Sequence, residues 1–407
     1  MACRLTLIIS VLTLMNFVLA GKYMVYPWDR KDMRTNNMVT KALDSLLGEA
    51  DVRVVGDQSR EIIDFWLISC TETDADSIRN WLKPGQTFNL PANKKFKGWL
   101  DFKRKPYVYD KRKLTDTWIY VIDDGIDPKS ADFAHLAVDD IEWLFAPDAK
   151  TDKTDDDPDY HGSCVASKAM GFKNGVSKSS RLVIVKATTV IHDVSWAFSQ
   201  IAKDIRDKNR QDKAAVVLPM TSKQSFLNNP RQWIWEWRAM LMNVHDLIEE
   251  QAFVVVAAGN FASRSKEIDT LPALFTSVAS YHFFYVVSAV SMSGFPLSDT
   301  QRDVDAIWAP GEVTCAGRKG SQSESGSSFS APMVAGLTAY LVGLGTPILK
   351  IRDTIVKAER PIHPRKTPRV IWNGLNGDTG SVRTTPSTPI LQLFENSTNA
   401  TGERAQE

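Results

Sequence analysis

Residues 326–336 have the sequence GSSFSAPMVAG, and a nearly continuous apolar run extends from them to Val342. Pro332 has no N–H to lose in the first turn of a helix, so a helix start is expected there. A helix that is apolar on every side is buried. This stretch therefore predicts a helix that runs through the core of the protein, with the hydroxyl of Ser328 at its mouth.

A serine in this place suits acyl transfer. Backbone N–H groups and the positive end of a helix dipole lie beside it and can stabilise an oxyanion. The alternative is an ordinary loop of serine and glycine before a core helix. The pattern is not the Gly-x-Ser-x-Gly elbow of α/β-hydrolases, because Ser330 occupies the position of the second glycine.

Two upstream segments carry side chains that could activate such a serine. The apolar run WIYVI at residues 118–122 is typical of a strand buried on both faces of a parallel sheet, and Asp123 follows it. Ligands and chemistry gather at the carboxyl ends of such strands. His161 then opens the segment HGSCVAS, whose small residues favour a tightly packed helix. A turn-forming Asp-Asp-Gly after a strand is the simpler interpretation of the aspartate.

Together these segments resemble the subtilisin-like serine proteases, over roughly residues 118–344 and in that family's order of aspartate, histidine and serine. The resemblance implies that Ser328 is the nucleophile, that His161 is its general base and that Asp123 orients the histidine. The segment AAGN at residues 257–260 resembles the family's oxyanion block, so the resemblance also implies an oxyanion donor in Asn260.

The same resemblance implies an α/β fold for residues 96–375, with a mainly parallel sheet and helices on both faces. Its substrate-binding block is poorly kept at residues 216–222, where Met220 and Thr221 align with it, and Gly259 is the third expected substrate contact. Asp124 replaces the small residue usual after the catalytic aspartate. These two departures favour a rival hypothesis, a catalytically impaired pseudoprotease that binds proteins without cutting them.

The first 20 residues predict a signal peptide. One early cation precedes an apolar run from Leu5 to Leu19, and Val18 and Ala20 are the small residues that a signal peptidase requires. A membrane anchor is the alternative, but the run is short for a bilayer span. We therefore expect a secreted, extracellular protein.

Residues 21–95 are expected to form a small ferredoxin-like α+β domain. Their pattern predicts strands at residues 23–26, 51–55 and 62–70 and helices at residues 37–47 and 73–82, in the order β-α-β-β-α. In the resembled family such a domain precedes the protease as an intramolecular inhibitor that the enzyme cuts away. An unrelated β/α domain is the alternative. The basic, proline-containing stretch at residues 88–114 gives no clear junction with the mature enzyme.

The resemblance also bears on the cysteines. If Cys3 leaves with the signal peptide and Cys70 with the pro-region, Cys164 and Cys315 remain, and the family's fold brings both to the active centre. An oxidising compartment then favours a disulfide between them. Two buried free thiols are the alternative.

Residues 376–407 predict a disordered tail with two glycosylation sequons, at Asn396 and Asn399. The aspartates of residues 152–159 are interpreted as a solvated acidic loop, with a structural calcium site as the alternative. No motif indicates a required cofactor or metal. The formal net charge of +1 implies neither nucleic acid nor an acidic surface as partner. Expected partners are protein or peptide substrates and the chain's own pro-domain, and the enzyme is expected to be a monomer.

Overall fold

The structure is a computed structural model of the whole chain. It describes residues 12–16, 22–27, 31, 33–47, 52–57 and 62–69, and then residues 116–371 with gaps at 138–139, 222–229, 264, 278–281, 293, 304 and 362–366. Three features of the sequence lie outside the described part: the predicted helix at residues 73–82, both glycosylation sequons, and the side chains of Trp233, Trp235 and Trp237.

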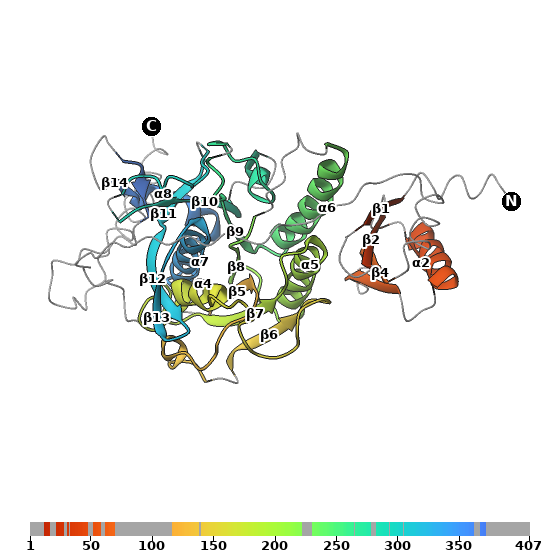
Figure 1. Ribbon diagram of the computed structural model, residues 1–407, viewed down its shortest axis with the longest axis horizontal. Helices are drawn as coiled ribbons and strands as arrows, with labels where there is room; N and C mark the ends of the chain where they lie inside the picture. Colours follow the sequence, from red (N-terminus) through yellow and green to blue (C-terminus); the bar gives the residue numbers. More distant parts are fainter. Residues whose placement is uncertain are drawn as a thin grey trace, which may run out of the picture.

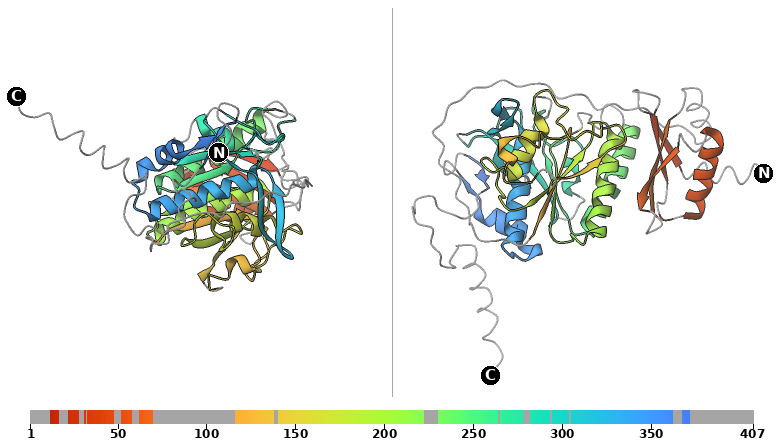
Figure 2. Two further views of the ribbon diagram at one scale, coloured as in Figure 1. Left: turned by 90° about the vertical axis from the view of Figure 1, so that its left-hand side faces the viewer. Right: turned by 90° about the horizontal axis from the view of Figure 1, so that it is seen from below.

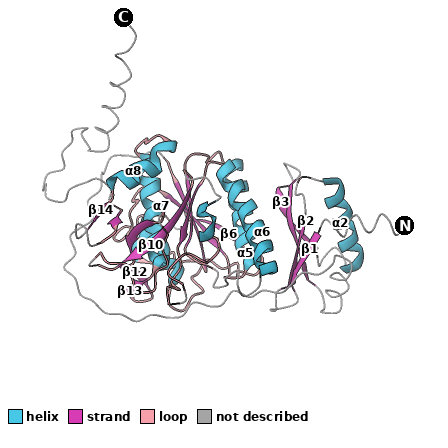
Figure 3. Ribbon diagram, turned by 90° about the horizontal axis from the view of Figure 1, so that it is seen from above, coloured by secondary structure: helices cyan, strands magenta, loops and turns pink. Residues whose placement is uncertain are grey.

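A seven-stranded sheet forms the centre of the larger unit, and all of its strand pairs are parallel. Its strands, in spatial order, are β11 (Ile307–Pro310), β10 (Phe284–Val290), β9 (Phe253–Ala257), β8 (Ala214–Leu218), β5 (Trp118–Asp123), β7 (Arg181–Lys186) and β6 (Glu142–Phe145). Helices cover both faces of this sheet (Figures 1 and 3). The expected α/β architecture is confirmed.

Alternation along the strands divides the interior into two apolar cores. In β5, Ile119 and Val121 face one core, whereas Tyr120 and Ile122 face the other, as the two-residue period of a strand requires. The first core contains α4 (His161–Met170), α7 (Ser327–Gly343) and α8 (Ile351–Ala358), and the second contains α5 (Ile191–Asp207) and α6 (Pro230–Glu249). Because both faces are covered, the strands are apolar throughout.

Helix α7 crosses the middle of the first core. It contacts α4 and five neighbouring strands, β5, β8, β9, β10 and β11, and nearly all of its residues are buried. The expectation that the helix starts near Pro332 is wrong, because α7 begins at Ser327 and Pro332 lies inside it. The proline has no N–H to donate to the Ser328 carbonyl one turn earlier, so the helix continues through it with one helical bond fewer.

A hairpin leads directly into α7. Strands β12 (Glu312–Gly317) and β13 (Gly320–Ser325) pair antiparallel, and Gly326 joins β13 to the helix. The hairpin also packs against α4, so it lies alongside the two helices that carry His161 and Ser328 (Figures 1 and 2).

The smaller N-terminal unit has an antiparallel sheet in the order β1 (Leu12–Asn16), β2 (Lys22–Pro27), β4 (Ile62–Ser69) and β3 (Val52–Asp57), with α2 (Met33–Leu47) packed against β3 and β4. Strands at residues 23–26, 51–55 and 62–70 and a helix at 37–47 were expected. Part of the expected signal peptide forms the edge strand β1. The expected division into signal peptide, pro-domain, enzyme and tail stays a prediction.

The N-terminal unit lies against the helix layer of α5 and α6 (Figure 3). Strand β3 contacts α5, and Val55 and Leu67 are buried in the same apolar core as the residues of that helix. Near the C-terminus, the described chain ends soon after the short pair β14 (Arg360–Pro361) and β15 (Arg369–Val370). In the part of the chain that the structure describes, no helix is long and apolar enough for a membrane span.

Candidate active site

Asp123 and His161 form the central pair of the site. Asp123 is the last residue of β5, and its side chain is fully buried. Both of its carboxylate oxygens lie 3.0 Å from Nδ1 of His161, the first residue of α4. A carboxylate on Nδ1 holds the proton there and leaves Nε2 as the basic nitrogen. The two residues are therefore arranged for proton transfer at Nε2.

Two glycines let α4 approach the aspartate so closely. A Cβ at Gly162 would lie 2.0 Å from the Gly125 carbonyl oxygen and 3.1 Å from Cβ of Asp123. Gly125 has φ +102°, and a Cβ there would lie 2.1 Å from the Thr154 carbonyl oxygen. A larger residue at position 162 would push α4 away from Asp123, and one at position 125 would overlap the backbone at Thr154.

Asp155 secures the first turn of α4, whose N-cap residue makes no side-chain capping bond. Its carboxylate accepts bonds from the Ser163 backbone N–H at 2.8 Å and from the Ser163 hydroxyl at 2.6 Å. The Ser163 hydroxyl in turn accepts a bond from the Asp127 N–H at 2.8 Å. Asp155 thus accepts a bond from an N-terminal N–H of the helix, although it lies eight residues earlier in the sequence, and it fixes the start of the helix.

The electrostatics of the site are dominated by carboxylates. Burial lowers the pKa of His161, but the Asp123 carboxylate outweighs this effect, with Asp157 and Asp124 adding to it, and the pKa is raised to about 9. Burial also raises the pKa of Asp124 to about 7, with the neighbouring Asp123 charge adding to the shift. Near neutral pH, His161 is therefore mostly an imidazolium paired with Asp123.

Ser328 is the second residue of α7 and is buried, with 7% of its surface exposed. The ring of the next residue, Phe329, packs on the imidazole of His161 with centroids 5.2 Å apart. This aromatic contact places the start of α7 beside the histidine. The serine block therefore lies next to the Asp123–His161 pair.

Asn260 is joined to the same end of α7 through Ser327. Its carbonyl oxygen Oδ1 accepts bonds from the Ser327 N–H at 2.9 Å and from the Ser327 hydroxyl at 3.0 Å. The amide nitrogen Nδ2 consequently faces Gly326, where a Cβ would lie 2.9 Å from it. Gly326 has φ +143°, a backbone conformation that favours glycine. This orientation directs the Asn260 amide nitrogen toward Gly326, at the start of α7.

The expected substrate contacts lie near Asn260 but differ in exposure. A Cβ at Gly259 would lie 3.4 Å from the Thr221 hydroxyl oxygen, so these two residues are neighbours. Thr221 is half-buried. The Met220 side chain is 8% exposed and belongs to the core beneath α5 and α6.

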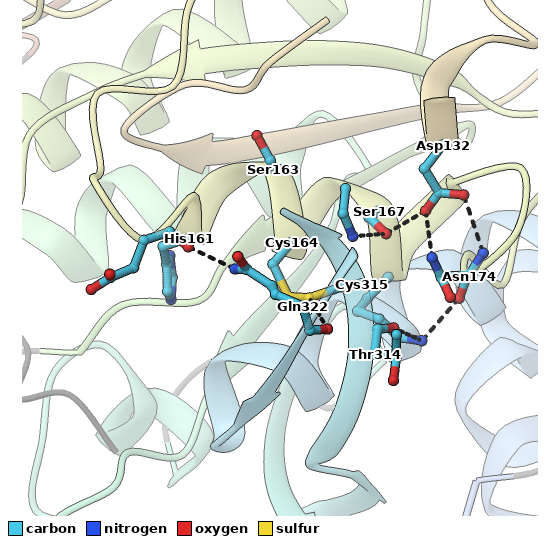
Figure 4. The surroundings of a disulfide bond; sticks show 12 residues. Asp132, His161, Ser163, Cys164, Ser167, Asn174, Thr314, Cys315 and Gln322 are labelled. Carbon is cyan, nitrogen blue, oxygen red and sulfur yellow. Dashed lines mark hydrogen bonds between the residues drawn. A yellow bond between two sulfur atoms is a disulfide. The ribbon is translucent and has the colours of Figure 1, made fainter. Parts of the chain in front are cut away.

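A disulfide joins Cys164 on α4 to Cys315 on β12, with Cα atoms 4.9 Å apart and both side chains buried (Figure 4). Hydrogen bonds reinforce this contact. The Ser167 hydroxyl accepts a bond from the Ala316 N–H at 3.0 Å, and Gln322 Nε2 donates to the Asp159 carbonyl at 2.6 Å. The bridge therefore ties the histidine helix to the hairpin that precedes Ser328.

The acidic loop before His161 is organised by a buried lysine. Lys186 Nζ lies 3.2 Å from an Asp156 carboxylate oxygen and also bonds Asp152. The ammonium thus supplies positive charge to this loop. Among the described residues, side chains that could converge on a metal are instead Asp148, His192 and Asp193. That no metal is required stays a prediction.

Sequence reasoning missed three supports of this site. In the sequence, Ser327 and Phe329 are simply two residues of the stretch 326–336, and Asp155 is one of several aspartates in a loop. The adjacency of Ser327 and Phe329 to Ser328 was a usable signal. Asp155 had no such signal, because only the folded path of the loop brings it to its partner Ser163.

Comparison with known proteins identifies this arrangement. The model of the subtilase family matches residues 115–360, which is more than half of the chain. The chain belongs to the subtilase family. Its expected membership is confirmed, and with it the relation to subtilisin-like serine proteases.

The relatives of this subtilase include fungal proteins. It is 27% identical over 270 residues to subtilisin-like protease 2 of Trichophyton rubrum, which covers 61% of the chain and 57% of the relative. It is 30% identical over 285 residues to subtilisin-like protease 4 of Arthroderma gypseum, covering 66% of the chain and 64% of the relative. The chain thus matches less than two thirds of the length of these relatives.

Two solved structures share the fold. The epidermin leader peptide processing serine protease of Staphylococcus aureus, solved as a serine-to-alanine mutant, has a TM-score of 0.59 at 16% identity and covers 88% of this chain and 96% of its own. A cold-adapted subtilisin-like serine proteinase has a TM-score of 0.50 at 20% identity, covering 67% of this chain and 96% of its own. At these identities the likeness concerns the fold alone.

Proposed function

We propose that this subtilase is a secreted serine endopeptidase, which hydrolyses protein or peptide substrates through an acyl-enzyme on Ser328. The observation that carries the proposal is the double contact between the Asp123 carboxylate and Nδ1 of His161, beside the start of α7. This contact orients the imidazole so that Nε2 is the basic nitrogen, and Ser328, next to Phe329, supplies a hydroxyl near it.

The proposed mechanism gives each residue one task. His161 Nε2 takes the proton of the Ser328 hydroxyl as its oxygen attacks the peptide carbonyl, and returns that proton to the leaving amine. Asp123 holds the proton on Nδ1 and stabilises the imidazolium. The Asn260 amide and the Ser328 N–H bind the tetrahedral oxyanion, and water then hydrolyses the acyl-enzyme by the reverse sequence.

The proposal includes synthesis as a self-processing precursor. Residues 1–20 act as the signal peptide, and the following α+β unit acts as an intramolecular inhibitor until it is removed. The packing of β3 against α5 supports a specific association between the two units. Asn396 and Asn399 are proposed glycosylation sites of the secreted form, which we propose to be a monomer without nucleic-acid or membrane partners.

The rival function is a pseudoprotease that binds proteins. Asp124 favours it, because this carboxylate helps to hold His161 in the imidazolium form, which cannot accept a proton. Assays above neutral pH, where His161 loses its proton, therefore distinguish an enzyme that is active at alkaline pH from a protein that has no activity.

Digestion of casein over a range of pH, with and without an irreversible serine-directed inhibitor, tests the proposal. We expect inhibitor-sensitive cleavage that rises with pH, and labelling of Ser328 by the inhibitor. The matched variant Ser328→Ala should neither cleave casein nor release its own N-terminal unit when produced in a protease-free host. A folded protein that cuts nothing at any pH would favour the rival. Normal maturation of Ser328→Ala would refute self-processing but not the peptidase activity.

A further inference from the structure

Gln301 lies against the segment that carries Asn260. It is fully buried in the connection between β10 and β11. Its backbone N–H donates to the Gly259 carbonyl oxygen at 2.9 Å, and two residues earlier the Asp299 carbonyl accepts a bond from the Ala262 N–H at 3.0 Å. The segment of Gln301 thus runs alongside residues 259–262, immediately beyond the strand β9.

The side-chain amide of Gln301 has one possible orientation. Its nitrogen Nε2 faces three acceptors, the Ser265 carbonyl at 3.2 Å, the Glu267 carbonyl at 2.7 Å and an Asp269 carboxylate oxygen at 2.7 Å. Rotating the amide by half a turn would set its oxygen against three other oxygens. These bonds therefore fix the position of the opposite atom, Oε1.

That fixed oxygen faces the position that a Cβ at Gly259 would occupy. Gln301 Oε1 is buried and has no hydrogen-bond partner among the described residues. A Cβ at Gly259, whose φ is +105°, would lie 2.6 Å from it. A buried carbonyl without a partner is disfavoured, so its presence calls for a reason beyond local hydrogen bonding.

The residue before Asn260 is consequently held from two sides. On the side of α7, the Ser327 hydroxyl accepts a bond from the Gly259 N–H at 3.2 Å. Ser327 also donates to the side-chain oxygen Oδ1 of Asn260. On the other side, Gln301 binds the Gly259 carbonyl and contacts its Cα face. Gly259 is thus bonded through its N–H to Ser327 and through its carbonyl to Gln301.

We propose that Gln301 is a positioning residue for the oxyanion donor Asn260. It touches neither substrate nor reacting atoms, because it is fully buried, and it acts by fixing Gly259 so that the Asn260 amide meets the developing oxyanion. The inference rests on the proposed peptidase function. Small displacements of a donor weaken transition-state stabilisation much more than substrate binding.

The variant Gln301→Met tests this role. Methionine has a similar length and keeps the backbone bond to Gly259, but it removes both the Oε1 contact and the three bonds of Nε2. The three acceptors left behind belong to exposed or half-buried residues, so water can replace the lost donor. We expect kcat on a peptide substrate to fall by about tenfold with KM unchanged, after normalisation by active-serine titration. Gln301→Asn, which keeps a shortened amide, should recover part of this loss.

Thr300→Val is the matched control. Thr300 is also buried in the same connection, and its hydroxyl accepts a bond from the Ala289 N–H at 3.0 Å and donates to the Gln301 backbone carbonyl at 3.3 Å. That carbonyl keeps its bond from the Ser288 hydroxyl at 2.8 Å, so the change leaves the Gln301 side chain and its backbone bond to Gly259 in place. This control should lower thermal stability about as much as Gln301→Met and leave kcat unchanged. Equal losses of kcat in the two variants would overturn the inference, since they would indicate general destabilisation.

Two further measurements separate positioning from stability. In the Asn260→Ala background, Gln301→Met should cause no further loss of kcat, because the donor that it positions is gone. A peptide boronic acid, which forms a tetrahedral adduct with the serine, should bind Gln301→Met about tenfold more weakly. Additive losses, or unchanged boronic acid affinity, would overturn the inference. A wild-type enzyme without any activity would instead contradict the proposed function.

Discussion

Removal of the disulfide between Cys164 and Cys315 should cost a large part of the stability of the domain. The bond closes a loop with a sequence separation of 151. In the chain-entropy model such a loop restricts the unfolded chain by about 17 cal/mol/K, which corresponds to about 5 kcal/mol at 25 °C. We therefore expect Cys164→Ala/Cys315→Ala to unfold at a temperature lower by roughly 10–20 °C.

The measurement is best made in the Ser328→Ala background, where self-digestion cannot obscure unfolding. Urea titration and calorimetry would compare the parent with the double variant and with each single variant. All three variants should lose a similar amount, since each of them removes the same cross-link. The parent unfolded under reducing conditions should resemble them. A double variant within about 1 kcal/mol of the oxidised parent would refute the loop-closure argument.

Three other substitutions test the site. Asn260→Ala should fold normally and lose roughly 10²–10³-fold in kcat with little change in KM, a size typical for the loss of one oxyanion donor; wild-type turnover would mean that other donors hold the oxyanion. Asp124→Ser should lower the pKa of His161, whose value of about 9 this carboxylate helps to maintain, so the rise of kcat/KM with pH should move to lower pH. An unmoved profile would contradict the electrostatic role of Asp124. Gly162→Ala should abolish activity, since its Cβ would lie 2.0 Å from the Gly125 carbonyl oxygen; an active variant would show that α4 can shift without losing the Asp123 contact.

The sheet was predictable because its strands are apolar on both faces. The runs at residues 118–122 and 214–218 could hardly be anything but buried strands, and in the structure β5 and β8 occupy them. The start of α7 was not predictable in the same way. Proline suits a first turn, and only the backbone conformation at Gly326 shows that the helix begins five residues earlier.

The supports of the site were even less accessible to sequence reasoning. Lys186 lies at the end of a strand whose apolar pattern continues without a break, and its role depends on the aspartates that the loop brings to it. Gln301 lies in an irregular connection with no periodic pattern, and two of its three amide partners are backbone carbonyls, which every residue possesses. Residue identity predicts such contacts poorly when they depend on the path of an irregular loop.

The central position of α7 has a consequence for the biosynthesis of the protein. Asp123, Asn260 and Ser328 are far apart in the chain, and the helix with the serine is buried only when β8, β9, β10 and β11 are in place around it. A nascent chain of only the first 300 residues lacks Ser328, the proposed nucleophile, and the whole of α7. A prematurely terminated chain of that length would therefore lack the proposed peptidase activity. Because such long-range pairing is slow to form, folding would also delay that activity after synthesis.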